Sequence, residues 1–173
     1  MRSSNSAAPV IKAGPRVHPG VVAAFCFLAL ALQVFLPVYL PLAGSFDIPL
    51  LAVVYFSLLS KNVLRGLLIG LLVGLAQDGL THGPIGLFGI TKSVTGYAAA
   101  AVSLVIEVRY PGARGVLAAS FYLAHQVFYW VIESALLGGR GGLDPAETLI
   151  LAATHAGMAL LAFRALDGVR TTA

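Results

Sequence analysis

Three side chains capable of proton exchange and hydrogen bonding recur at helical spacing in the second half of the chain. His125, Tyr129 and Glu133 are four residues apart, so in a helix they share one face. Such a row could serve as a proton relay or line a polar pocket. It could equally form a hydrogen-bonded seam against a neighbouring helix, which in lipid contributes about 0.6 kcal/mol per contact. Of these roles we favour the seam.

Three more ionisable residues, Asp78, Lys92 and His155, interrupt segments that are otherwise apolar. A charge inside a bilayer is costly unless it is paired or reaches water. Lys92 could extend its amine to the membrane surface, or it could pair with Asp78 or Glu133. We expect an ion pair, because leaving all three charges unpaired would be strongly unfavourable. For His155 we expect a hydrogen bond that supports helix packing.

The common signatures of catalytic and metal sites are missing from the sequence. It has no phosphate-binding loop, no GxSxG or HExxH motif and no glycosidase-like pair of carboxylates. The single cysteine, Cys26, lies in an apolar segment and has no partner for a disulfide within the chain. No two histidines have the spacing of metal ligands. We therefore expect a protein that is not an enzyme and that has neither a metal nor a cofactor.

The composition is that of an integral membrane protein. Hydrophobic residues make up 58% of the 173 residues and charged residues only 10%, with a mean hydropathy of +0.90. Soluble domains carry about 25% charged residues, so this chain has too few to cover a surface facing water. The net charge of +4 does not indicate nucleic-acid binding, because the basic residues occur singly at the ends of apolar segments.

The apolar segments predict one domain, residues 21–166, built as an all-α bundle of six transmembrane helices of about 20 residues each. A polar segment, residues 1–20, is predicted to be a disordered tail, and residues 167–173 a short second tail. The six helices are expected at 21–42, 46–60, 63–77, 84–106, 115–137 and 146–163.

The basic residues predict the orientation of this bundle. With six spans, all but two of them fall on one side: Arg2, Lys12, Arg16, Lys61, Arg65, Arg109, Arg114, Arg164 and Arg170. The other side receives only Arg140, and Lys92 lies within a span. Basic residues are enriched in cytoplasmic loops, so both termini are expected in the cytoplasm.

A glycine stripe in the third predicted span could be the structural centre of the bundle. Gly66, Gly70, Gly74 and Asp78 are four residues apart and share a helical face. Glycines at this spacing let another helix backbone approach closely. That helix could belong to the same chain or to a partner protein, and the sequence leaves both open. Residues 78–83 are predicted as a polar break, after which Pro84 opens the next helix.

The segment GLLIGLLVGLAQDGLTHGPIGLFGITKSVTGY resembles the rod shape-determining protein MreD family. The matching features are the glycine-spaced span with Asp78 at its end, the run from Gly83 and Pro84 through Gly86 to Leu87, and the pair Gly96-Tyr97. The preceding FDIPLLAVVYFSLL also fits the second span of the family. The resemblance covers residues 46–97 in motif and the whole chain in the number of spans.

This resemblance implies a subunit of the bacterial inner membrane that serves lateral wall growth and regulates cell shape. The family works beside the bitopic scaffold MreC, the actin-like MreB, the polymerase RodA and a class B penicillin-binding transpeptidase, and it has no established catalysis. We expect a scaffold that contacts partners through the glycine stripe and the turn formed by Asp78, Gly83, Pro84 and Gly86.

The expected fold is also similar to the substrate-binding component of energy-coupling-factor vitamin transporters, which are six-helix bundles. That similarity implies an alternative function, in which the chain is a small-molecule-binding subunit of a transporter. Its pocket would then use the intramembrane polar residues Asp78, Lys92, His125, Glu133 and His155.

Overall fold

The computed structural model describes residues 18–81, 84–106, 111–138, 142 and 144–171. Within these ranges the chain is all-helical and has no strand. Its elements are α1 (Pro19–Tyr39), the 3-10 helix η1 (Pro41–Ser45), α2 (Ile48–Ser60), α3 (Val63–Thr81), α4 (Leu87–Val105), α5 (Pro111–Leu137) and α6 (Pro145–Thr171). Six helices are long and apolar enough to cross a membrane, η1 and α2 together forming the second. The predicted all-α fold class is confirmed, and the chain has the character of a multi-pass membrane protein.

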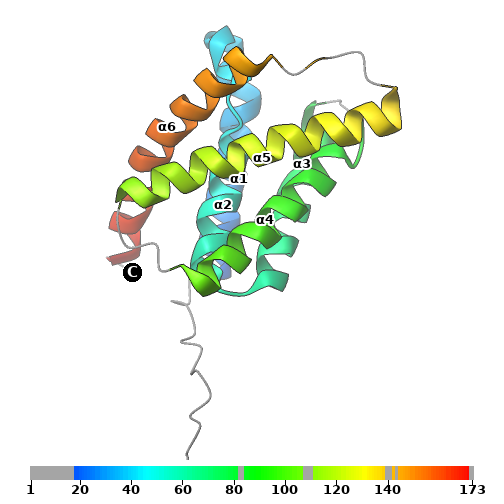
Figure 1. Ribbon diagram of the computed structural model, residues 1–173. Coiled ribbons are helices and arrows are strands. Elements are labelled where there is room, and N and C mark those ends of the chain that lie inside the picture. The colour runs from blue at the N-terminus through cyan, green and yellow to red at the C-terminus, as the bar shows by residue number, and fades with distance from the viewer. Residues whose placement is uncertain (1–17, 82–83, 107–110, 139–141, 143, 172–173) are drawn as a thin grey trace, which may run out of the picture.

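Helix α2 is the central element of the bundle (Figure 1). It contacts all five of the other long helices, and most of its residues are buried. Val53 and Val54 are almost fully enclosed, and Tyr55 packs 5.0 Å from the ring of Phe163 on α6. In contrast, α1 is the least buried span and lies at the edge of the bundle. The core is therefore built around the shortest span.

Helices α3 and α4 lie side by side and form the closest helix pair in the molecule (Figure 1). A Cβ atom added to Gly66, Gly70 or Gly74 would lie only 2.0–2.3 Å from a backbone oxygen of α4. Those three oxygens belong to Gly96, Lys92 and Phe88, in that order. No side chain fits between the two backbones, so the glycine stripe serves packing within the chain. This is one of the two alternatives that the spacing leaves open.

Several helix ends differ from the sequence-based prediction. α3 continues to Thr81, beyond the predicted end at 77, and Asp78 therefore lies inside a helix rather than in a break. α6 continues to Thr171, through most of the segment predicted as a polar tail. No proline follows Pro145 to stop that helix. The expected disordered tail, residues 1–20, overlaps α1, which begins at Pro19, and its first 17 residues lie outside the described part of the chain.

Candidate functional site

The start of α2 is the point at which side chains from several helices meet. The Asp47 N–H donates to Nε2 of His155 on α6 at 3.0 Å, and the Ile48 N–H donates to Oε1 of Gln33 on α1 at 2.9 Å. The Leu50 N–H donates to Oδ1 of Asp47 itself at 3.1 Å, and Pro49 has no N–H. The free N–H groups of a helix start are costly in lipid unless they are paired. Here each one has a partner inside the bundle.

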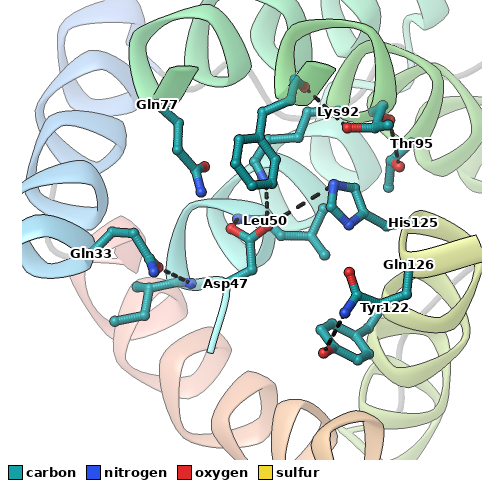
Figure 2. Close-up of polar contacts among 12 residues, drawn as sticks. Gln33, Asp47, Leu50, Gln77, Lys92, Thr95, Tyr122, His125 and Gln126 are labelled. Carbon is teal, nitrogen blue, oxygen red and sulfur yellow. Dashed lines mark hydrogen bonds and ion pairs between the residues drawn. The ribbon is translucent and has the colours of Figure 1, made fainter. Parts of the chain in front are cut away.

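The second carboxylate oxygen of Asp47 holds a buried cation. Oδ2 forms an ion pair with Nζ of Lys92 on α4, whose side chain is fully buried (Figure 2). The same Nζ lies 4.8 Å from the centre of the Phe88 ring, a favourable place for a cation. Asp47 therefore caps α2 with one oxygen and binds α4 with the other. Through this residue and its neighbours, α1, α2, α4 and α6 are joined at one point.

The partner predicted for Lys92 is wrong, although the prediction of a buried pair is confirmed. Lys92 pairs with Asp47 and not with Asp78 or Glu133. The reason is that a carboxylate has two oxygens, so Asp47 can cap its helix and still bind a cation. Asp47 lies 45 positions from Lys92 in the sequence, and no spacing rule relates the two residues.

Asp78 is stabilised by hydrogen bonds from backbone N–H groups and forms no ion pair within 4 Å among the described residues. It is buried in α3 and accepts hydrogen bonds from the N–H groups of Gly86, Phe88 and Gly89 at 2.9–3.0 Å. The remaining N–H of this helix start, on Leu87, donates to the Pro84 oxygen at 3.3 Å. A carboxylate at a helix N-terminus is also favoured by the helix dipole. Asp78 is therefore an N-terminal cap for α4, supplied by α3.

His155 is held in a single tautomer by its two hydrogen bonds. Nε2 accepts from the Asp47 N–H, so Nδ1 carries the proton and donates to the Leu151 oxygen at 2.8 Å. Its ring stacks on Tyr122 of α5, with 3.9 Å between the ring centres. This arrangement confirms the expected packing hydrogen bond of His155.

Gln33, Asp47, Lys92 and His155 form a polar cluster at the start of α2. Of the three residues spaced along one face of α5, His125, Tyr129 and Glu133, only some reach this cluster. His125 is buried, with Nε2 at 4.0 Å from Oδ2 of Asp47, too far for a hydrogen bond, and neither ring nitrogen has a hydrogen-bond partner among the described residues. The Tyr129 ring lies 5.0 Å from that of Phe88. Glu133 is half-buried and makes no hydrogen bond or ion pair with the described residues. The hydrogen-bonded seam that we expected is not present among the described residues, where His125 and Tyr129 contact Phe88 of α4 through their rings.

A small polar cavity adjoins this cluster. Its volume is about 170 Å³, and it is lined in part by Gln33, Asp47, Gln77, Tyr122 and Tyr129. Oε1 of Gln77 is buried without a hydrogen-bond partner in the described structure, and Figure 2 shows this amide pointing toward the space above Asp47. Binding sites for drug-sized ligands have volumes of about 300–1,000 Å³, so this cavity suits only very small polar molecules.

Sequence reasoning missed two glutamines at the cluster and also Asp47. Gln33 and Gln77 are single amides in apolar helices, and such a residue in a membrane helix usually needs a partner. This pattern could have identified both glutamines from the sequence. Asp47 was missed for a different reason: an aspartate directly before a helix is expected as an N-terminal cap, and that local role does not indicate a second, distant partner. Within the part of the chain that the structure describes, no three His, Cys, Asp or Glu side chains are placed to hold a metal ion.

The residues expected to contact partner proteins lie in three different environments. The three glycines of the stripe and Asp78 face α4, so that surface is already covered. Gly86 is the N-cap residue that precedes α4, and it has a φ of +99°, a conformation that glycine adopts readily. Pro84 is exposed, and Gly83 lies outside the described residues. The stripe therefore packs against α4 in this structure, and partner contact through the turn at Pro84 and Gly86 stays a prediction.

Comparison of the chain with models of protein families, with curated proteins and with solved structures gave no match.

Proposed function

We propose that this protein is a non-enzymatic scaffold subunit of a bacterial cell-wall elongation complex, located in the inner membrane. The sequence support is the MreD-like run from the glycine stripe to Gly96-Tyr97. The proposed neighbours are an MreC-like bitopic scaffold, an MreB-like filament, a RodA-like polymerase and a class B penicillin-binding transpeptidase. Both termini are placed in the cytoplasm, following the distribution of basic residues.

The observation that carries this proposal is the use of the intramembrane charges within the chain. Asp47 and Lys92 neutralise each other, and Asp78 is occupied by three backbone N–H groups. A catalytic or transport site presents convergent polar groups to a cavity that a substrate can enter. Here they join helices, as expected of a protein whose task is to present a fixed shape to its neighbours.

The alternative function is a small-molecule-binding subunit of a vitamin-type transporter. The unpaired Oε1 of Gln77 and the unpaired ring of His125 favour it, since both could bind a polar ligand. The size of the polar cavity, about 170 Å³, argues against a vitamin-sized molecule. We therefore rank this function second.

Native mass spectrometry of the tagged protein, extracted gently from its own membrane, distinguishes the two functions. The scaffold predicts a complex with a single-span protein or a wall synthase. A different six-span protein, tagged and extracted in parallel, serves as the control for nonspecific association. A chain free of protein partners that carries one discrete small ligand would instead support the transporter subunit.

A further inference from the structure

A large apolar groove runs along the edge of the bundle, away from the polar cluster. It has a volume of about 1080 Å³ and lies between α1 and α3, with the end of α2 as its floor. Leu68, Leu72 and Phe27 line it and are exposed, so the groove opens toward the lipid-facing surface. Helix α1, the least buried span, forms one of its walls.

The polar residues of this groove are all at one end. His18 precedes α1, Ser60 ends α2 and Arg65 lies in the first turn of α3. Among the described residues that line the groove, every other one is apolar, apart from Cys26, and none is acidic. The groove thus has a basic end followed by a long apolar wall, which is the polarity of an anionic lipid.

The basic end has donors available for an anion. The Arg65 side chain is exposed and makes no hydrogen bond or ion pair with the described residues. Nδ1 of His18 accepts from the Gly20 N–H at 3.2 Å, which leaves Nε2 as a donor in the neutral ring. A guanidinium and an imidazole N–H match the oxygens of a phosphate.

The length of the groove matches one leaflet of a membrane. Its lining runs from Pro19 to Leu30 on α1, about 17 Å along the axis, and from Arg65 to Val73 on α3, about 12 Å. Half of a typical hydrocarbon core is about 15 Å thick. A partner's transmembrane helix would extend over the whole core of about 30 Å and would leave half of its length outside the groove.

From these observations we infer that the groove between α1 and α3 binds an anionic phospholipid, with its acyl chains against the apolar wall and its phosphate at Arg65 and His18. The lipid comes from the leaflet that contains the start of α1. This inference depends neither on the proposed wall-elongation function nor on the assignment of sides. Its physical basis is the match in polarity, length and charge.

Native mass spectrometry on the delipidated full chain tests the inference. The protein is mixed with equal amounts of dioleoyl phosphatidylglycerol and dioleoyl phosphatidylcholine, and retained lipids are counted. We expect preferential retention of phosphatidylglycerol. Arg65→Gln should lower that preference about fivefold, the effect of one basic residue near an anionic headgroup. The control Arg164→Gln removes an exposed arginine outside the groove and should leave the preference unchanged.

A second pair of variants tests the groove itself. Ala23 lines it, and Ala24 is an exposed neighbour that does not. Ala23→Trp should abolish lipid retention, and Ala24→Trp should not. If Ala23→Trp does not fold, Leu72→Trp with Leu64→Trp as its control makes the same comparison on α3. Equal retention of the two lipids, equal effects of the paired variants, or loss of a bound protein or second copy with Ala23→Trp would overturn the inference.

Discussion

At the scale of single residues, Asp47 and Asp78 stabilise the starts of two helices in different ways. Each provides acceptors for the free N–H groups at the start of a helix that begins within the bundle. Asp78 uses both oxygens on the backbone of α4. Asp47 uses one on α2 and the other on Lys92. The difference explains why the only buried lysine among the described residues pairs with Asp47.

The Asp47–Lys92 pair gives a prediction for stability. Lys92→Met leaves a carboxylate unpaired inside the bundle, and breaking a buried ion pair costs about 3–5 kcal/mol. We expect a lower folded yield and a lower Tm in detergent, measured by size exclusion and thermal unfolding. Asp47→Asn in addition to Lys92→Met removes the stranded charge and should recover part of the loss. Lys61→Met, at a lysine without an ion pair in the described structure, is the control. Purely additive losses for Asp47→Asn and Lys92→Met would contradict the pair.

At the scale of helices, the close approach of α3 and α4 depends on individual glycines. A Cβ at Gly70 would lie 2.0 Å from the Lys92 oxygen, and backbone cannot move aside as a flexible side chain can. We expect Gly70→Ala to destabilise the protein by about 3 kcal/mol, at the upper end for overpacking. Gly79 is on the same helix with nothing within 4 Å of its added Cβ. Gly79→Ala should therefore be neutral or stabilising by up to about 1 kcal/mol. Similar effects of the two variants on Tm would show that the helices are not in this contact.

The six membrane-spanning helices could be predicted from the sequence, but the residues at which they begin and end could be predicted only in part. Six apolar segments were sufficient because a span is defined by its length and composition. The end of α3 was misplaced because Asp78, Gly79 and Thr81 resemble a polar turn. In the structure, the Asp78 carboxylate accepts hydrogen bonds from N–H groups at the start of α4, and the Thr81 hydroxyl donates to the Gln77 oxygen at 2.8 Å. Both residues can therefore remain inside α3. A local sequence pattern does not show which polar side chains will have hydrogen-bond partners in the folded protein.

Some members of the polar cluster were predicted from the sequence, but the contacts between them were not. Lys92, His125 and His155 were identified because ionisable residues are conspicuous in apolar helices. Asp47, the shared partner of Lys92 and His155, is separated from His155 by 108 positions, and no spacing rule relates the two. Glu133 shares a helical face with His125 yet lies outside the cluster, because residues eight positions apart on a helix are about 12 Å apart along its axis.

At the scale of the whole molecule, the polar cluster and the basic groove end lie near opposite ends of the bundle. Asp47 is at the start of α2, close to the end of α1, whereas Arg65 and His18 lie where α2 ends and α1 begins. If the distribution of basic residues sets the orientation, the cluster lies in the outer half of the membrane and the groove opens to the cytoplasmic leaflet. The side to which each loop belongs therefore determines which leaflet supplies the lipid.

Single cysteines determine this orientation directly. In a Cys26→Ser background, which removes the only native cysteine, Thr81→Cys and Gly112→Cys place one thiol at each end of the bundle. Both positions are exposed, so each thiol is accessible. With both termini in the cytoplasm, an impermeant maleimide added outside intact cells should label position 81 and not position 112. Permeabilised cells should be labelled at both, which shows that each thiol reacts. Labelling of 112 alone in intact cells would invert the orientation, because the even number of spans keeps both termini together on whichever side position 112 occupies.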